Sequence, residues 1–337
     1  MKKFTALLMT LTLTAALLAG CGQNASTDEG KTPEDGSKPS SKETSAWPEK
    51  PIEVIIPYSP GGDTDFNARA YTEYLSEELG VPVVASNVTG SSGTIASRQV
   101  KDADPDGYSV LFSHTVMNVN EMVGIADFGM DDFEIACIAA ASPGELITVR
   151  SDLGVKNLDE LKAYTEAHPG ELDLAIDFGT MVNINGLQMQ EAGIDVNLIT
   201  AGSASERVAA LAGGHCDIII NAYGSVKDYL TTGEFVALGT TSTKPTEALG
   251  DIPTCKEQGY DIALDKYYFF AFPKGTPAEI VEKFSDAVKT VSEKPEYQES
   301  IKTAYAQEPF YASTEEGLGL MQEAKDVIWS FEDQMAG

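Results

Sequence analysis

Short runs of apolar residues alternate with longer segments in which apolar residues recur every three or four positions. The short runs predict β-strands, and the periodic segments predict amphipathic helices. The expected strands are 52–56, 81–84, 108–113, 134–141, 144–149, 172–176, 196–200, 217–221 and 235–240. Because strands and helices alternate along the chain, we expect an α/β fold with parallel sheets.

Polar residues mark the expected helix starts. Asn157, Ser203 and Ser313 each stand three residues before a glutamate, which is the pattern of a capping box. The stretch 63–65 is expected to cap a helix with an apolar stripe of Ala68, Tyr71, Leu75 and Leu79. A further helix is expected around 95–100, and Pro277 is expected at the first position of a long helix.

Residues 150–262 read as a second α/β unit inserted into the first, with crossovers near 141–148 and 263–272. The predicted domain 1 is 47–142 plus 272–337, and the predicted domain 2 is 143–271. Two such domains joined by two crossing strands form a clam shell. A ligand cleft is then expected at the carboxyl ends of the strands.

Two glycine-rich junctions between a strand and a helix lie in the first domain. One contains Gly61, Gly62, Asp63 and Thr64, and the other is Ser91-Ser92-Gly93-Thr94. Such junctions point free N–H groups outward and suit an anion such as a carboxylate or phosphate. The alternative is two ordinary strand-to-helix turns. Neither junction matches a nucleotide-binding motif.

The first 46 residues differ from the rest of the chain. Residues 1–20 have a charged start and an apolar body that is too short for a permanent membrane span. Small residues directly before Cys21 resemble a bacterial lipoprotein signal, which implies cleavage there and lipid attachment to Cys21. The alternative is an ordinary secretory signal with a chance cysteine. Residues 21–46 offer almost nothing to bury and are expected to be a flexible tether.

The formal net charge is -29. This acidity argues against nucleic-acid binding and against long-range electrostatic capture of small anions. A bound anion is therefore expected to be held by local N–H groups. Cys137 lies in an apolar run and is expected to be a buried thiol, whereas Cys216 and Cys255 could form a disulfide. No C-x-x-C pair occurs, so a cysteine metal site is not expected.

An ordered set of short motifs resembles the extracytoplasmic solute receptors of tripartite tricarboxylate transporters, the Bug family. The motifs are 57–62 with Asp65 and 68–69, then Asn87, Gly90 and Gly93, then 105–108, 213–214 with Asp217, 251–254 and 273–277. The resemblance covers about 48–332. It implies a two-domain, periplasmic-binding-protein-like clam shell (type II) with two crossover strands. It also implies that a small carboxylate binds at the two glycine loops. By position, those loops supply Tyr58, Ser59, Gly61, Gly62, Asp63 and Thr64, and Ser91, Ser92, Gly93 and Thr94.

The second domain departs from the family pattern. Asp177, Gly179 and Thr180 stand where a Ser/Gly-rich loop is usual, and Thr200-Ala201-Gly202 replaces the usual Tyr-Lys-Gly. Asn221 stands where an Asp often ends the next strand. An aromatic residue and a cation are therefore missing at the positions where the family often has them beside the cleft. Asp177 would suit a ligand amine or hydroxyl; the alternative is an Asp177 that faces solvent or caps a helix.

Two further residues are candidate ligand contacts. His114 follows a strand, and Tyr268 belongs to the aromatic run 267–270 on the second crossover; hinge core is the alternative for these aromatics. His168 and His215 lie near turns and are expected to be solvated.

The expected function is a lipid-anchored extracytoplasmic receptor that delivers a small carboxylate-bearing solute to membrane transporter subunits. It is expected to act as a monomer without a cofactor or metal. One alternative is a ligand-sensing partner of a membrane sensor kinase. An enzyme is less favoured, because the sequence has no G-x-S-x-G or H-E-x-x-H motif. The sequence does not identify the solute.

Overall fold

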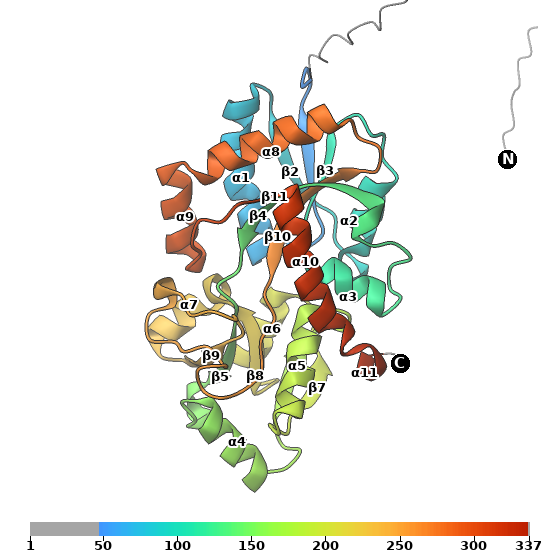
Figure 1. Cartoon of the computed structure of the whole chain (residues 1–337). Coiled ribbons are helices and arrows are strands. Elements are labelled where there is room, and N and C mark those ends of the chain that lie inside the picture. The colour runs from blue at the N-terminus through green and yellow to red at the C-terminus, as the bar shows by residue number, and fades with distance from the viewer. Residues whose placement is uncertain (1–46, 336–337) are drawn as a thin grey trace, which may run out of the picture. The chain divides into compact units, whose positions relative to one another are not determined.

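The computed structural model describes residues 47–335 as an α/β protein with two mixed sheets, each covered by helices (Figure 1). The expected α/β two-domain fold is therefore confirmed. The signal at 1–20, Cys21 and the tether at 21–46 lie outside the described residues. Within 47–335, no helix is long and apolar enough to cross a membrane.

The strands are β1 (Ile52–Ile56), β2 (Val83–Asn87), β3 (Ser109–His114), β4 (Phe133–Ala141), β5 (Glu145–Arg150), β6 (Asp173–Ile176), β7 (Asn197–Thr200), β8 (Ile218–Ala222), β9 (Phe235–Thr240), β10 (Tyr267–Pro273) and β11 (Ala312–Ser313). The helices are α1 (Asp63–Leu79), α2 (Thr94–Lys101), α3 (Val116–Met122), α4 (Leu158–Ala167), α5 (Met181–Glu191), α6 (Ala204–Ala212), α7 (Tyr223–Thr232), α8 (Ala278–Ser292), α9 (Pro295–Tyr305), α10 (Thr314–Trp329) and α11 (Glu332–Met335). Four short 3₁₀ turns are η1 (Ser91–Gly93), η2 (Met130–Asp132), η3 (Ser151–Leu153) and η4 (Glu247–Leu249).

Five strands of the first sheet follow the same order as the five strands of the second, and β11 is an additional edge strand of the first sheet. The first has the order β2-β1-β3-β10-β4-β11, and the second has the order β7-β6-β8-β5-β9. In each sheet the strand that follows a crossover, β10 or β5, is antiparallel to both of its neighbours. The expectation of parallel sheets was therefore wrong for these two strands. Strand–helix alternation predicts parallel neighbours only where a helix connects two strands of one sheet. β5 and β10 are entered from the other sheet without an α-helix, so the alternation does not predict their direction.

We call the part of the chain built on the first sheet lobe 1 and the part built on the second sheet lobe 2. In Figure 1, lobe 1 lies above lobe 2, and β4, β5 and β10 run through the junction between them. The first crossover is the short turn 142–144. Gly144 adopts φ +91, and a Cβ there would lie 2.1 Å from Thr240 Oγ1, so this turn requires glycine. The boundaries predicted for the two domains stay a prediction.

Each lobe has its own apolar core. β1 is buried at every position except Glu53, and Ile52, Val54 and Ile56 belong to the cluster that contains Tyr71, Phe270 and Phe284. The corresponding core of lobe 2 lies around β6, β8 and α4. A smaller cluster joins the lobes beside the cleft, because Val119 of α3, Ile184 of α5 and Ile328 of α10 pack together.

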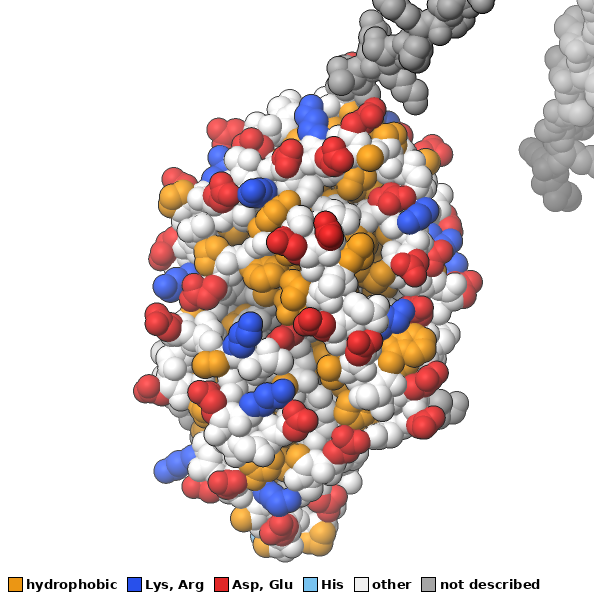
Figure 2. All heavy atoms as spheres, in the orientation of Figure 1, with side chains coloured by type: hydrophobic (Ala, Val, Ile, Leu, Met, Phe, Trp, Pro, Cys, Tyr) orange, Lys and Arg blue, Asp and Glu red, His pale blue; other side chains and the backbone are white. Residues whose placement is uncertain are grey.

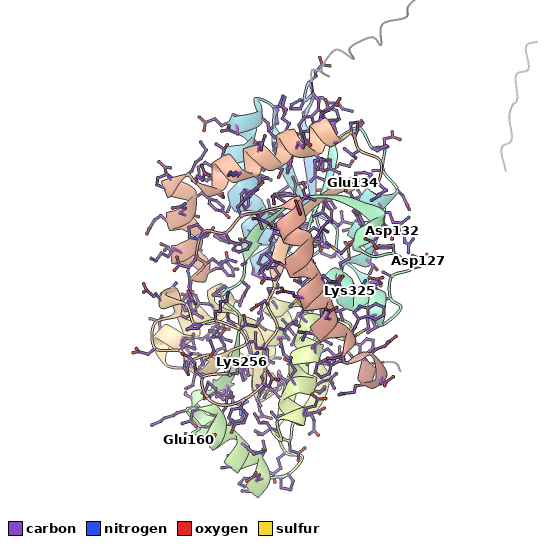
Figure 3. All side chains as sticks on the ribbon, viewed as in Figure 1. Asp127, Asp132, Glu134, Glu160, Lys256 and Lys325 are labelled. Carbon is purple, nitrogen blue, oxygen red and sulfur yellow. The ribbon has the colours of Figure 1, made fainter. Side chains whose placement is uncertain are left out.

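The C-terminal helices form hydrogen bonds with both lobes. Lys325 of α10, which is labelled in Figure 3, donates to Glu121 of α3 at 2.9 Å. Gln334 of α11 donates to Glu191 of α5 at 2.7 Å. The surface around these helices carries many more acidic than basic side chains (Figure 2), in keeping with the net charge of -29. Chain segments from the C-terminus therefore bridge lobe 1 and lobe 2.

Most of the expected helix caps are present. Asn157, Ser203 and Ser313 each accept the N–H three residues ahead. Two expectations were wrong. Gly62 is the N-cap of α1, so 63–65 form its first turn, and Pro277 is the N-cap of α8, one position earlier than predicted.

The three cysteines within residues 47–335 are free thiols. Cys137 is buried as expected, and burial raises the pKa of its thiol to about 12. Cys216 and Cys255 are also free and buried, so the structure contradicts the disulfide considered for them. Cys216 packs among residues on the α6 side of the lobe 2 sheet, whereas Cys255 packs in the cluster that contains Ile147 and Leu158.

Candidate functional site

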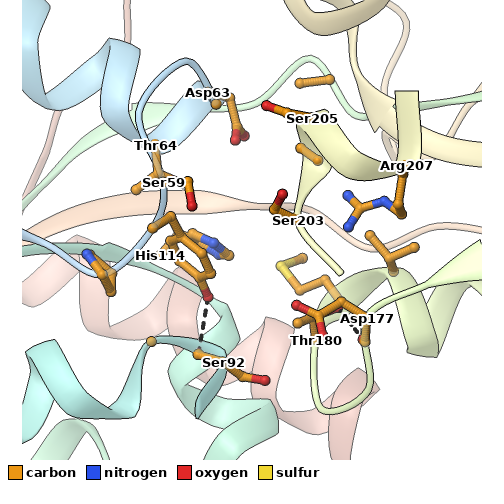
Figure 4. A pocket seen from close by; sticks show the side chains of 18 of the residues that line it. Ser59, Asp63, Thr64, Ser92, His114, Asp177, Thr180, Ser203, Ser205 and Arg207 are labelled. Carbon is orange, nitrogen blue, oxygen red and sulfur yellow. Dashed lines mark hydrogen bonds between the residues drawn. The ribbon is translucent and has the colours of Figure 1, made fainter. Parts of the chain in front are cut away.

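A cavity of about 300 Å³ lies between the two lobes (Figure 4). Its size is typical of sites for small ligands. The lining residues are Pro57, Tyr58, Ser59, Gly62, Asp63, Thr64, Thr89, Gly90, Ser91, Ser92, Gly93, His114, Glu145, Asp177, Thr180, Met181, Val182, Ser203, Ala204, Ser205, Arg207, Ala222, Ser225 and Lys266. Five helices, α1, α2, α5, α6 and α7, begin at or next to these residues. Helix N-termini carry free N–H groups and partial positive charge, so the cavity favours an anion.

The first glycine loop is held rigidly by Asp65. One carboxylate oxygen of Asp65 accepts the N–H of Gly61 at 3.0 Å, and the other accepts from Arg69 at 2.9 Å and Asn87 at 2.8 Å. Asn87 also donates to the carbonyl of Tyr58 at 2.8 Å. The first-turn N–H groups of α1 are thereby fixed at the cavity wall.

The second glycine loop adopts an unusual backbone. Ser91, Ser92 and Gly93 have φ values of 47, 50 and 91, all in the left-handed region. The carbonyl of Ser92 accepts hydrogen bonds from Tyr58 at 3.3 Å and Asn120 at 2.9 Å. Non-glycine residues persist in this conformation only where their surroundings hold them, and such residues cluster at functional sites.

His114 ends β3 and lies beside the first loop. Its ring stacks on Tyr58 with centroids 5.2 Å apart, and its Nδ1 accepts the N–H of Val116 at 3.2 Å. Burial, reinforced by the charge of Lys266, lowers the pKa of His114 to about 3. The ring is therefore neutral at pH 7, with its proton on Nε2.

Three buried charged groups meet where the crossovers enter the cavity. Lys266 donates to both Asp63 of lobe 1 and Glu145 of lobe 2, and Tyr268 also donates to Asp63. Burial opposes ionisation of Asp63, but the charge of Lys266 and both hydrogen bonds hold the pKa of Asp63 well below its usual value. Burial raises the pKa of Glu145, and the negative charge of Asp63 adds to this effect. Lys266 is thus already neutralised within the protein.

Arg207 is the principal cation on the lobe 2 wall. It projects from the first turns of α6 and is only 6% exposed. Its Nε donates to Asn221 at 3.0 Å, and its Nη1 donates to the carbonyl of Gly202 at 2.8 Å. Among residues 47–335, Arg207 forms no ion pair within 4.0 Å. A guanidinium has five N–H donors, so three remain for a ligand.

Asp177 and Thr180 form the loop that faces Arg207. Thr180 donates to the backbone carbonyl of Asp177 at 2.7 Å and is the N-cap of α5. Burial raises the pKa of Asp177, against an opposing effect from the charge of Arg207. Figure 4 places Arg207 and Asp177 on one side of the cavity and Ser59, Thr64 and His114 on the other. The two lobes therefore contribute different chemistry to one site.

Many of the sequence-predicted residues do line this cavity. They are Tyr58, Ser59, Gly62, Asp63, Thr64, Ser91, Ser92, Gly93, His114, Asp177 and Thr180. Six others do not line it: Gly61, Thr94, Gly179, Gly202, Asn221 and Tyr268. Their contacts explain why. Gly61 and Thr94 form hydrogen bonds within the loops, Gly179 packs against Ile125, Gly202 and Asn221 hold Arg207, and Tyr268 is buried behind Asp63.

The cavity does contain cations, but they come from positions other than the family's usual lysine, which is Ala201 here. Arg207 and Lys266 both line the cavity, and sequence reasoning missed them together with Glu145. A signal for Arg207 was present, because it shares the buried face of α6 with Val208 and Leu211. A charged residue on the apolar face of a helix indicates a special environment. Lys266 directly precedes the aromatic run of the second crossover, which was already placed near the cleft.

The remaining histidines lie away from this cavity. His168 stacks on Tyr164 and pairs with Glu171 at 3.3 Å, and His215 is exposed. No group of three side chains suited to a metal ion occurs in the part of the chain that the structure describes. The arrangement as a whole is suited to holding an anionic ligand between the lobes.

Comparisons with known proteins agree with this geometry. The model of the family "Tripartite tricarboxylate transporter family receptor" (TctC) matches residues 67–328. A protein of Cupriavidus necator, "UPF0065 protein in gbd 5'region", is 29% identical over 286 residues, which cover 82% of this chain and 85% of that protein.

Two solved structures share the fold. MatC from Rhodopseudomonas palustris, with bound malate, superimposes with a TM-score of 0.74 at 23% identity and covers 86% of this chain and 100% of its own. A second R. palustris protein, with adipate, superimposes with a TM-score of 0.77 at 23% identity and covers 86% of this chain and 97% of its own.

Proposed function

Because this chain belongs to the tripartite tricarboxylate transporter receptor family, we propose that it binds a small carboxylate-bearing solute outside the cytoplasm and delivers it to a membrane transporter of that type. The family is one of extracytoplasmic solute receptors, which supports a binding role. The malate and adipate held by the two R. palustris proteins support a carboxylate as the class of solute.

One observation carries the proposal. The cavity joins the N-termini of several helices to a buried arginine that has no carboxylate partner among the described residues. A buried cation without a counter-ion is costly, so an anionic ligand stabilises this arrangement. Hydrogen bonds to a charged group contribute roughly 1.5–3 kcal/mol each, so three or four cover much of the roughly 8 kcal/mol that micromolar binding requires.

The test is a thermal-shift screen against mono-, di- and tricarboxylates, with the corresponding amides as neutral controls. A cognate carboxylate at a hundredfold excess over Kd should raise the stability by roughly 2.7 kcal/mol. The Arg207→Gln variant should lose most of this solute-induced shift. Its melting temperature without solute shows whether the substitution itself destabilises the fold. A protein stabilised equally by carboxylates and amides would contradict the proposal.

The membrane attachment is a separate part of the proposal. We propose that lipid on Cys21 anchors the receptor and that 21–46 act as its tether. Cys21→Ser should release the protein from membranes without changing its solute affinity. Protein that still sediments with membranes at high salt would argue against the lipid anchor.

A further inference from the structure

We propose that Arg207 and Asp177 together recognise one end of the solute, with an anionic group on Arg207 and a neighbouring hydroxyl or amine on Asp177. The solute class is then a 2-hydroxy or 2-amino carboxylate. This inference rests on the proposed function, because it specifies which carboxylates the receptor selects.

Arg207 has a fixed position and unused donors. Asn221 and the carbonyl of Gly202 hold its Nε and Nη1, so the guanidinium plane cannot turn freely. Asn221 is itself held by the carbonyl of Ala204 at 2.9 Å. A guanidinium held in this way can accept a carboxylate through two parallel hydrogen bonds.

Asp177 has unused acceptors. No hydrogen bond or ion pair of its carboxylate is found within the described part of the chain, and Thr180 binds only its backbone carbonyl. Arg207 and Asp177 line the same side of the cavity and affect each other's ionisation, yet no ion pair within 4.0 Å joins them. The space between them can therefore receive a ligand group that satisfies both side chains.

The charges of the cavity disfavour a ligand that carries only carboxylates. Asp63, Glu145 and Asp177 supply three carboxyl groups, against the two cations Lys266 and Arg207. Lys266 is already bound by Asp63 and Glu145. A ligand bound to Arg207 on this side of the cavity also faces Asp177, where a hydrogen-bond donor is attractive and a second carboxylate is repelled.

The test compares succinate, L-malate and L-aspartate, which differ only in having a hydrogen, a hydroxyl or an amine at one carbon. Isothermal titration of the full chain should give affinities for malate or aspartate at least about tenfold above that for succinate, as expected for a hydrogen bond to a charged group. In Asp177→Ala, the affinities for malate and aspartate should be within about twofold of the affinity for succinate, and succinate should still bind. Asp261→Ala removes an exposed charge from the same lobe and is the control, with the preference unchanged.

The outcomes separate this inference from the proposed function. Succinate that binds the unaltered chain as tightly as malate and aspartate would overturn the inference and leave the receptor function in place. A preference that survives Asp177→Ala would also overturn it. If none of the three acids bound, the inference would be overturned, whereas the proposed function would fail only if no carboxylate of the thermal-shift screen stabilised the protein. Arg207→Lys keeps the positive charge but loses the planar guanidinium, which can form two parallel hydrogen bonds. It should therefore lower the affinity for each of the three acids by about tenfold or more.

Discussion

The two walls of the cavity recognise a ligand in different ways. The lobe 1 wall is formed by the glycine loops at the N-terminus of α1 and at η1, together with the side chains of Ser59, Thr64 and His114. The lobe 2 wall adds two charged side chains that are not ion-paired within residues 47–335, Arg207 and Asp177, to the N-termini of α5, α6 and α7. Backbone donors can hold almost any carboxylate, because they do not depend on side-chain identity. Selection among carboxylates is therefore assigned to lobe 2, where one substitution changes the chemistry.

The walls meet at the buried cluster of Lys266, Asp63 and Glu145, and the largest effect is expected there. Lys266→Met leaves two carboxylates buried without their cation, which should lower the free energy of unfolding by about 3–5 kcal/mol. Urea denaturation measures this loss. Adding Glu145→Gln should recover part of it, because one of the two carboxylates is then neutral.

Lys325→Met is the matched control for this cluster. Lys325 pairs with Glu121 at 2.9 Å, but both side chains are partly exposed. Exposed pairs contribute about 0–1 kcal/mol. Equal losses for Lys266→Met and Lys325→Met would show that the junction between the walls is not a stabilising ion cluster.

Two glycines separate folding from binding on the lobe 1 wall. Gly93 has φ +91, and a Cβ there would lie 3.0 Å from the Cβ of Pro57, so Gly93→Val should destabilise the fold by roughly 2–4 kcal/mol. Gly62 has φ -84, and a Cβ there would have the Ser59 carbonyl oxygen, 3.8 Å away, as its nearest neighbour. Gly62→Val should therefore keep its melting temperature and lose solute affinity, because its side chain blocks the approach to α1.

Melting curves with and without solute distinguish these two glycines. Unchanged affinity in Gly62→Val would remove the first loop from the site. An unchanged melting temperature in Gly93→Val would show that the second loop can relax around a side chain.

His114 gives the lobe 1 wall a pH dependence. Its pKa is about 3 in the folded protein, against 6.5 as the ordinary value, so between these values unfolding takes up a proton. Stability should therefore fall as the pH falls below 6.5, by about 2 kcal/mol at pH 5. The raised pKa of Glu145 acts in the opposite direction, so the effect of His114 is isolated by comparing variants.

Urea denaturation at pH 7 and pH 5 measures the contribution of His114. His114→Gln should lose about 2 kcal/mol less than the unaltered chain between these pH values. His168→Gln changes a histidine away from the cavity and is the control. The same pH dependence in His114→Gln and in the unaltered chain would contradict the shifted pKa.

Local features of the fold were predictable from the sequence. The caps at Asn157, Ser203 and Ser313 depend only on a residue and the N–H three positions ahead, and all three are present. The glycine loops were predictable because turns next to an apolar strand need special backbone angles. Both of these signals are short in sequence.

Features that depend on distant parts of the chain were not predictable. The bounds of helix α5 were not predicted, because it is buried on most of its surface, including Asn183 and Asn185, and so lacks a clear apolar stripe. The antiparallel directions of β5 and β10 follow from the crossovers, not from any local pattern. Lys266 became recognisable as a site residue only when Asp63 and Glu145 were brought beside it, from 203 and 121 positions away.

The smallest expected effect concerns the contact that joins the two walls at the cavity. Ser92 Oγ of lobe 1 donates to the carbonyl of Phe178 in lobe 2 at 3.0 Å. Ser92→Ala removes this bond but leaves the Ser92 carbonyl held by Tyr58 and Asn120, so the loop should keep its shape. The closed arrangement should lose about 1 kcal/mol, which lowers solute affinity about fivefold.

Thr94→Val is the control for this contact, because the Thr94 hydroxyl donates to the carbonyl of Ser91 inside the same loop. Titration measures affinity, and small-angle scattering with subsaturating solute measures the share of closed molecules. Since a solute shifts the population toward the state that it binds best, Ser92→Ala should show a larger mean radius than Thr94→Val at the same solute concentration. Equal radii and equal affinities for the two variants would mean that closure does not depend on this bond. Lobe 2 would then hold the solute through Arg207 and Asp177 alone, without help from the direct contact between the walls.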